Sequence, residues 1–442
     1  MRLSLVAAAL GLNVSLIASS SSLAQQAAPS VSPATQPGAI GQQPQPQAQQ
    51  QPTIGGAAAP VEPHLIVQGI PGVAQCPAPD WIKPGMRLTF LQASASIQSN
   101  PNDPSLVEDP NGDIVDDRGR RWRETLYHAG GAGGAGYSIV NIVAVEPGVI
   151  VMQADSYLLV NGNAGPASLT TTIGCWCHSS GCDYFLHPRM LAQLPQVERP
   201  GFSIMRHTYD VNNQHFNAVR ITNISNGRMT YVYDLSSGVL LSQNGSSVAP
   251  GGQVYRDGYI VTTTGNTLAI TRYINSRDLN LPWQTSPMPD WVRTAKRMRY
   301  TGARVTKGPP NIGVQDFSIG LDVTVETSYV GNTFAVYKVS TQPRSPSDIP
   351  GANDPSTAVA VCGPGSLGGL WMSPAALRQL RTGQAIDTDA TTGTQTVVEF
   401  AGAGGQGQNG KAIAVITSNS RAQKIQCVYD ATDGKLLRVT GS

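Results

Sequence analysis

The feature that most constrains the fold of this 442-residue chain is an internal repeat. Three pairs of similar segments occur in the same order along the sequence. Ordered self-similarity of this kind is the signature of duplication. The sequence therefore predicts one copy over residues 63–283 and a second copy over residues 284–442. The paired segments are residues 79–95 with 289–305, residues 187–194 with 373–380, and residues 230–241 with 426–437.

Most segments within each copy have the composition of β-strands. They are rich in Val, Ile, Tyr and Thr and are bounded by Gly, Pro and Asn, which favour turns. The third pair contains YVYDLSSGVLL and CVYDATDGKLL, which read as strand, turn and strand, with Asp and Gly supplying the turn. The clearest strand segments are residues 137–145, 148–160, 230–235, 258–265 and 334–341.

One short helix is predicted in each copy, within the second pair of segments. In the second copy Ser373 is placed to cap the helix, and Pro374 suits its first turn. Leu377 and Leu380 then lie on one helical face. We therefore expect a mainly β protein with two tandem, duplicated antiparallel β domains. Each is expected to be a curved sheet or half-barrel with one short helix covering its open face.

The hairpin pattern Tyr-Asp-x-x-x-Gly-x-Leu-Leu occurs at residues 233–241 and again at 429–437. It resembles a hairpin of periplasmic lipoprotein-carrier-like half-barrel families. In those families a curved antiparallel sheet wraps an apolar ligand, so the resemblance implies such a sheet and such a ligand here. The match is confined to the hairpin of each copy, and no site residues are transferred from it.

The first 24 residues have the layout of a secretory signal peptide. Arg2 precedes an apolar run, and small residues up to Ala24 provide a cleavage site. The run is too short and too interrupted for a membrane span of about 20 residues. No later segment approaches that length of apolar sequence. The mature protein is therefore expected to be periplasmic or secreted, with no membrane span.

Residues 25–62 are dominated by Gln, Pro, Ala and Gly, a composition that cannot bury enough apolar surface to fold. We expect this segment to be a disordered tether. Charged residues make up only 13% of the chain, against about a quarter in typical soluble proteins, and the formal net charge is +2. That balance gives no overall positive field, so nucleic acid is not an expected partner.

The densest group of reactive side chains is GCWCHSSGCD at residues 174–183. One residue separates Cys175 from Cys177, whereas attachment of a c-type haem needs two. With His178 and Cys182 these residues could supply four zinc ligands, but their spacing differs from that of zinc knuckles. Copper is another alternative, because thiolate and imidazole bind it. An exported compartment favours disulfides, so no metal or cofactor is predicted.

A bridge between Cys362 and Cys427 is predicted, because these are the two cysteines of the second copy. It would join a loop to the hairpin. The remaining four cysteines are Cys76, Cys175, Cys177 and Cys182. They allow three pairings. The preferred pairing joins Cys182 to one of its neighbours within the cluster and Cys76 to the other.

Six basic residues gather at the start of the second copy, with no acidic residue among them. Such a group could dock an anionic polysaccharide or a lipid head group. The alternative is a solvated strand face, because alternation would point Arg297 and Arg299 outward and Met298 and Tyr300 inward. The six residues of this possible anion patch are Arg293, Lys296, Arg297, Arg299, Arg304 and Lys307.

Two other motifs lack the context that their chemistry requires. The glycine-rich residues 129–136 match the spacing of a dinucleotide-binding loop but lead into a predicted strand, whereas that loop must open a helix. The acidic residues 108–121 have oxygen ligands at alternating positions but lack the glycine of a calcium loop. We interpret the first as a loop and the second as a surface turn.

The leading interpretation is an exported, non-enzymatic binding or structural protein of the cell envelope. An apolar or amphipathic ligand, such as a lipid or a polysaccharide, is expected. The first alternative is an exported hydrolase that acts on a polymer from a site in the first copy, with His187 and His207 as candidate bases. All six histidines precede the second copy, which therefore supplies no histidine base. The second alternative is a metal-handling protein that uses the cluster from Cys175 to Cys182.

Overall fold

The computed structural model describes most of the chain from Trp81 to Ser442. The described residues are 79, 81–99, 107–108, 114–115, 134–147, 149–160, 163–164, 168–175, 184–200, 202–211, 214–224, 227–256, 259–306, 317–344, 355–403 and 412–442.

The first copy forms one large antiparallel sheet of eleven strands among the described residues. Its order is β6-β5-β4-β1-β13-β12-β11-β10-β9-β8, and β7 also pairs with β5. A short helix, α4, spans Pro188–Gln193, and a separate two-stranded ladder joins β2 (Val107–Glu108) to β3 (Ile114–Val115). The strands of the large sheet are β1 (Met86–Ser99), β4 (Gly134–Glu146), β5 (Val149–Val160), β6 (Asn163–Ala164), β7 (Ser168–Cys175), β8 (Val197–Arg199), β9 (Phe202–Val211), β10 (Gln214–Ile224), β11 (Gly227–Asp234), β12 (Leu240–Arg256) and β13 (Tyr259–Asp278).

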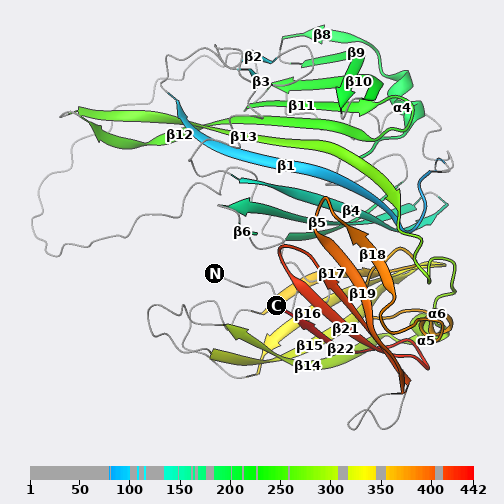
Figure 1. Ribbon diagram of the computed structural model, residues 1–442. Helices are drawn as coiled ribbons and strands as arrows, with labels where there is room; N and C mark the ends of the chain where they lie inside the picture. Colours follow the sequence, from blue (N-terminus) through cyan, green and yellow to red (C-terminus); the bar gives the residue numbers. More distant parts are fainter. Residues whose placement is uncertain are drawn as a thin grey trace, which may run out of the picture.

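The second copy contains two smaller antiparallel sheets, which lie below the large sheet in Figure 1. Two short helices, α5 (Asp290–Thr294) and α6 (Pro374–Leu377), accompany them, so the prediction of one helix per copy is wrong for the second copy. The first sheet consists of β14 (Arg297–Thr306), β15 (Phe317–Val330), β16 (Ala335–Pro343) and β17 (Ser356–Cys362). The second consists of β18 (Ala385–Asp389), β19 (Thr394–Ala403), β20 (Ala412–Asn419), β21 (Lys424–Asp430) and β22 (Leu436–Gly441).

The two copies pair their main strands in the same order. In the first copy β1, β4, β5 and β7 are followed by α4 and then by β8 to β12; in the second, β14 to β17 are followed by α6 and then by β18 to β22. The difference is β13, which pairs with both β1 and β12 and merges the two strand sets of the first copy into one sheet. The prediction of a mainly β chain with open antiparallel sheets and few short helices is confirmed.

The repeated hairpin adopts the same backbone geometry in both copies. Gly238 and Gly434 have φ values of +80° and +79°, a region that favours glycine. Each glycine oxygen accepts a hydrogen bond from a residue before the helix, Leu186 at 2.8 Å and Met372 at 2.9 Å. A Cβ atom at these glycines would lie 1.8 and 2.0 Å from the carbonyl oxygens of Leu186 and Met372. Both the turn and the close approach therefore require glycine; the sequence pattern predicts the turn, and the structure adds the close approach.

Helices α4 and α6 occupy the predicted positions, although one predicted cap is wrong. Leu377 and Leu380 are both buried, but α6 ends at Leu377, so Leu380 lies beyond the helix. Ser373 stands at the N-cap of α6, but its side chain makes no capping hydrogen bond, and its Oγ is buried without a partner in the described part. In the first copy His187 takes this position, and its Nδ1 accepts a hydrogen bond from the Arg189 amide at 3.0 Å.

Each copy packs its helix into its own apolar core. Met190 and Leu191 of α4 are fully buried among side chains of β1, β4, β5 and β9 to β12. Trp81 packs against this core, and Trp291 packs against the second core while its Nε1 donates to the Asp433 carbonyl at 2.7 Å. The repeated tryptophans are thus core anchors. Trp283 also lies in the second core, ahead of the predicted copy boundary at residue 284.

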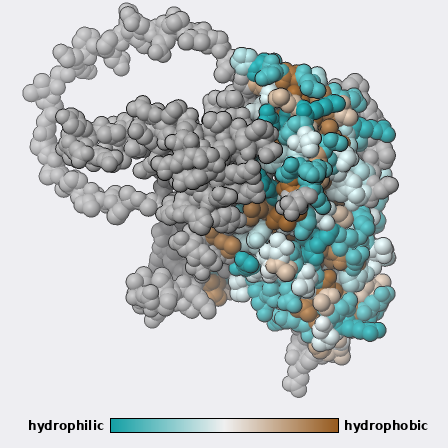
Figure 2. Space-filling view, turned by 45° about the horizontal axis from the view of Figure 1, so that its top comes forward, coloured by the Kyte–Doolittle hydropathy of each residue, from teal (hydrophilic) through white to brown (hydrophobic). Residues whose placement is uncertain are grey.

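The copies contact each other through β4 and β5 on one side and β16 and β17 on the other. Val143 and Val151 of the first copy form an apolar cluster with Phe334, Val336 and Val361 of the second. On the face drawn in Figure 2, hydrophobic residues lie in small groups between hydrophilic ones. Among the described residues, no helix is long and apolar enough to cross a membrane.

Candidate functional site

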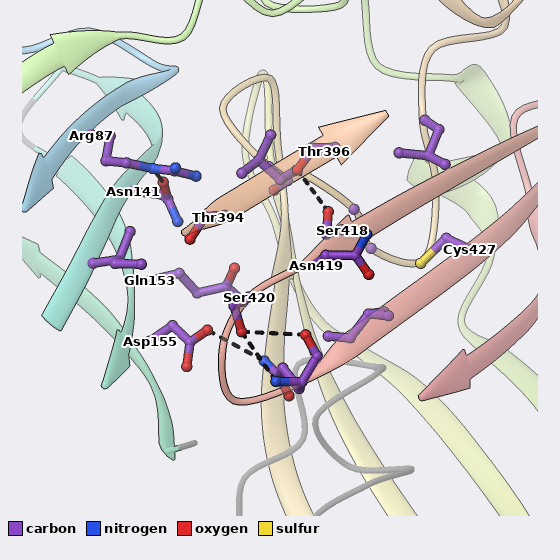
Figure 3. A pocket seen from close by; sticks show the side chains of 18 of the residues that line it. Arg87, Asn141, Gln153, Asp155, Thr394, Thr396, Ser418, Asn419, Ser420 and Cys427 are labelled. Carbon is purple, nitrogen blue, oxygen red and sulfur yellow. Dashed lines mark hydrogen bonds between the residues drawn. The ribbon is translucent and has the colours of Figure 1, made fainter. Parts of the chain in front are cut away.

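A cavity of about 150 Å³ lies between the two copies. The first copy contributes residues of β1, β4 and β5, and the second contributes residues of β17, β19, β20 and β21 (Figure 3). Strand alternation explains how β4 and β5 can do this. Val140 and Met152 face the core of the first copy, whereas Asn141 and Gln153, the next residues along, face the cavity.

A buried ion-pair network lies beside the cavity and links the copies. Arg87 is 1% exposed, and its guanidinium contacts Asp387 at 2.6 Å and Asn141 Oδ1 at 2.9 Å. Arg277 contacts the second oxygen of Asp387 at 2.7 Å and Asp389 at 3.4 Å. Burial lowers the pKa of the Arg87 guanidinium, and the Asp387 carboxylate opposes this. Two arginines and two aspartates therefore compensate one another across the interface.

Asp155 of β5 is the carboxylate that lines the cavity. Its Oδ2 accepts one long hydrogen bond, from Gln423 Nε2 at 3.3 Å (Figure 3). Its Oδ1 is buried and makes no hydrogen bond to any described residue. Burial raises the pKa of Asp155 to about 6, while Gln423 and the Arg87 charge oppose this shift. A carboxyl with such a pKa changes its charge near neutral pH.

Hydroxyl and amide groups cover the opposite wall. The Oγ atoms of Thr396 and Ser418 lie 2.9 Å apart, and Asn419 follows at the end of β20. In the next turn, Ser420 Oγ accepts from the Gln423 amide at 3.2 Å. Figure 3 shows this turn opposite Asp155, so that Gln423 reaches across the cavity from one copy to the other. The lining is therefore polar on both sides, with apolar contributions from Ile139, Val361, Leu367, Ile416 and Ile425.

Cys427 lines the cavity and Cys362 lies buried nearby, but both are free thiols. The predicted bridge between them is therefore not present in this structure. Both thiols lie beside the backbone of Gly368 and Gly369: a Cβ at Gly368 would lie 3.6 Å from Cys427 Sγ, and one at Gly369 would lie 2.6 Å from Cys362 Sγ. Cys362 Sγ also accepts a hydrogen bond from the Leu370 amide at 3.0 Å. Burial raises the pKa of Cys362 to about 12 and that of Cys427 to about 11.

The other predicted cysteine sites lie largely outside the described residues. Cys76, Cys177, His178 and Cys182 are outside them, and Cys175 ends β7 opposite Val149. Their disulfide pairing stays a prediction. The acidic turn between Glu108 and Ile114 is likewise outside the described part. Among described side chains, no group of three or more His, Cys, Asp or Glu residues could hold a metal ion.

The structure describes five of the six basic residues, and they differ in exposure. Arg297 and Arg299 are exposed, while Met298 and Tyr300 pack against the core, as the solvated-strand alternative predicts. Arg304 lies on the same side of β14 as Met298 and is half-buried. The remaining members are Arg293 on α5, which donates to the Asn332 carbonyl at 2.9 Å, exposed Lys296, and Lys307 outside the described residues.

The two histidines predicted as candidate bases lie away from the cavity lining. His187 caps α4, and His207 of β9 is paired through Nδ1 with the Thr208 carbonyl at 3.0 Å. Burial lowers the pKa of both imidazoles. Their positions thus reflect local packing, and neither shares a site with the carboxyl of Asp155.

Sequence reasoning missed the cavity residues, although two signals were present. Arg87 is repeated as Arg297, so the repeat marks its position but not its burial. Asp155 is the single acidic residue in the mainly apolar strand from Val149 to Val160. A comparison of the chain with models of known protein families and with curated proteins gives no match.

Proposed function

We propose that this chain is an exported, non-enzymatic binding protein of the cell envelope that holds a small polar ligand between its two copies. The observation that carries the proposal is the cavity lined by both copies, with Asp155 facing the Ser420 to Gln423 turn. Binding pockets commonly lie where two structural units meet and carry a few convergent polar groups. The predicted signal peptide at residues 1–24 and the tether at residues 25–62 support export.

A polar ligand fits the described residues better than the apolar ligand expected from the hairpin. Where side chains are described, the helix of each copy and the aromatic residues around it cover the sheet face on which an apolar ligand would lie. Phe90 and Tyr184, for example, pack in the first core with tilted rings whose centroids lie 4.9 Å apart. The inter-copy cavity instead presents hydroxyl, amide and carboxyl groups. We therefore favour a small polar molecule, or one polar unit of a larger chain.

Duplication is part of the proposal. The common strand order, the paired helices and the matching glycine turns support descent of both copies from one unit. A site between copies would arise when the outer face of one copy becomes a wall for the other. Binding would then depend on the contact between copies as well as on the lining residues.

Native mass spectrometry of the mature protein, purified from its own exported compartment without added metal or reductant, tests the proposal. We expect a non-covalent adduct of discrete mass. Asn419→Trp should abolish it by filling the cavity, because Asn419 is half-buried in the lining. Asn332→Trp is the matched control, since Asn332 is exposed in a turn outside the cavity. Absence of any adduct on the wild-type protein, or equal adducts on both variants, would contradict the proposal.

A further inference from the structure

We infer that the cavity binds a small organic cation, an ammonium compound with hydroxyl or amide groups, and that Asp155 is its charge partner. This inference rests on the proposed binding function and specifies the chemistry of the ligand. It follows from three properties of the lining: the balance of charge, the state of the Asp155 carboxylate, and the size of the space.

The charge balance of the cavity leaves Asp155 without a partner. The ionisable residues of the lining are Arg87, Asp155 and Cys427. Arg87 is compensated by Asp387 at 2.6 Å, and the thiol of Cys427 is held neutral by burial, which raises its pKa to about 11. No cationic side chain of the described part lies within ion-pair distance of Asp155. A cationic ligand would supply the missing charge and offset the cost of burying the carboxylate.

The Asp155 carboxylate is also short of hydrogen-bond donors. Asp155 is half-buried, and its buried Oδ1 has no hydrogen-bond partner in the described part while its Oδ2 accepts one bond at 3.3 Å, whereas buried polar atoms are normally satisfied. The turn that carries Gln423 is fixed by the bonds from the amides of Ala422 and Gln423 to Ser420 Oγ, both 3.2 Å. The carboxylate therefore faces a fixed wall with space beside it. An ammonium group donates three hydrogen bonds and suits this position.

Other ligand classes fit less well. An anion would find no free cation among the lining residues, because the Arg87 guanidinium is bound to Asp387 and Asn141. A divalent metal ion prefers several oxygen ligands, including more than one carboxylate in most sites, and the lining offers one carboxylate. A neutral hydroxyl compound would leave the carboxylate charge unpaired. Gln153, Ser418 and Asn419 are available to bind hydroxyl or amide groups of the same ligand.

The size of the cavity limits the ligand. A volume of about 150 Å³ matches that of cavities known to hold a benzene-sized molecule. An amino alcohol, a diamine or one amino sugar ring approaches this size. A lipid does not fit within it, and a polymer could place only one unit there.

Binding is expected to weaken in acid. The groups nearest the Asp155 carboxyl are Arg87 from β1, neighbouring Tyr157 on β5, and Gln423 from the opposite copy. Burial raises the pKa of Asp155 to about 6 in the empty protein, so protonation competes with the ligand below that pH. An ammonium compound stays protonated through this range. For the alkylamines ethanolamine and putrescine, affinity should therefore fall by about tenfold for each pH unit below 5 and be nearly constant between pH 7 and 8.

Isothermal titration of the mature protein with ethanolamine, putrescine and glucosamine tests the inference, with ethylene glycol and glucose as neutral counterparts. We expect at least one amine to bind at pH 7.5 at least tenfold more tightly than its neutral counterpart. Asp155→Asn should weaken that binding at least tenfold, and Asp210→Asn, an exposed aspartate of β9, should leave it unchanged. A thermal unfolding transition at or above that of the wild type would show that the Asp155→Asn protein is folded.

Three outcomes would overturn the inference: equal binding of neutral compounds and amines, unchanged binding by Asp155→Asn, or no binding of any amine at millimolar concentration. The last outcome is separated from failure of the proposed function by the native mass spectrum. A discrete adduct that depends on Asn419, together with no amine binding, would reject the ligand class and keep the binding function. No adduct and no amine binding would reject both.

Discussion

The outer faces of corresponding strands in the two copies differ in kind. In the first copy, the outer residues of β4 and β5 are apolar where they meet Phe334 and polar where they line the cavity. In the second copy, the outer face of β15 carries Asp322 and Glu326, which form solvent-exposed pairs with Arg344 and Arg297. The same alternating strand pattern can therefore carry an interface in one copy and a solvent-exposed surface in the other. Residues that alternate with the core residues point away from the core, so they can differ without changing it.

The arginines at the matching repeat position show this difference most directly. Arg87 is buried in a network with Asp387, whereas the side chain of Arg297 is 54% exposed and pairs with Glu326. Arg87→Ala should destabilise the protein by about 3–5 kcal/mol, because it leaves a buried carboxylate without its closest partner. Arg297→Ala should change stability little, because water replaces an exposed ion pair. Chemical denaturation of both variants measures the two changes in the free energy of unfolding. Similar losses of stability would show that the two arginines do not differ as their burial predicts.

The two hairpin glycines provide a test of what the copies share. Gly238→Ala and Gly434→Ala should each lower the free energy of unfolding by about 2–4 kcal/mol. The new Cβ would overlap a carbonyl oxygen, and the positive φ is unfavourable for alanine. Gly383→Ala is the matched control, since Gly383 has a φ of +81° but no atom within 4 Å of the position that a Cβ would take. It should cost only about 1–2 kcal/mol. Thermal unfolding compares all three, and a milder effect at one hairpin than at Gly383 would show that the copies do not share this contact.

Local sequence signals predicted the parts of the fold that depend on local chemistry. The strand from Val149 to Val160, both hairpin turns and both helices follow from strand composition, glycine and proline positions and apolar spacing. The role of β13 could not be predicted, because its pairing with β1 joins residues that are far apart in the sequence, such as Met86 and Asp278. The site was missed for the same reason: Arg87 meets Asp387 across 300 positions. Alternation gives the face of a side chain but does not identify what covers that face.

Asp155 of β5 is expected to make the stability of the protein depend on pH. Its pKa is about 6 in the folded protein and near 3.9 when unfolded, so the native state binds more protons between these values. The free energy of unfolding should therefore fall as pH rises from about 4 to 6, by about 2 kcal/mol, and stay lowered above pH 6. Asp155→Asn should remove this fall and be more stable than the wild type at pH 7.5.

The control for this pH dependence is Asp210→Asn, an exposed residue of β9. Its unfolding curve should follow that of the wild type at each pH. Urea denaturation at half-unit intervals from pH 4 to 8 gives the comparison. Parallel curves for the wild type and Asp155→Asn would show that the carboxyl is not held in a buried environment and would weaken the role assigned to it in the cavity.

Substitution of Cys427 is expected to have the smallest effect on stability. The size of that effect distinguishes a free Cys427 thiol from a bridge between Cys427 and Cys362. The matching residue of the first copy is Tyr231, so this thiol belongs to one copy alone. With free thiols, Cys427→Ala removes one small buried group and should cost about 1 kcal/mol. If a Cys362–Cys427 bridge formed in the exported protein, the loss would be about 2–4 kcal/mol. Alkylation after unfolding without reductant should modify both cysteines in the first case and neither in the second. The predicted exported compartment favours a bridge, whereas both thiols are free in the structure, so the labelling result decides between the two states.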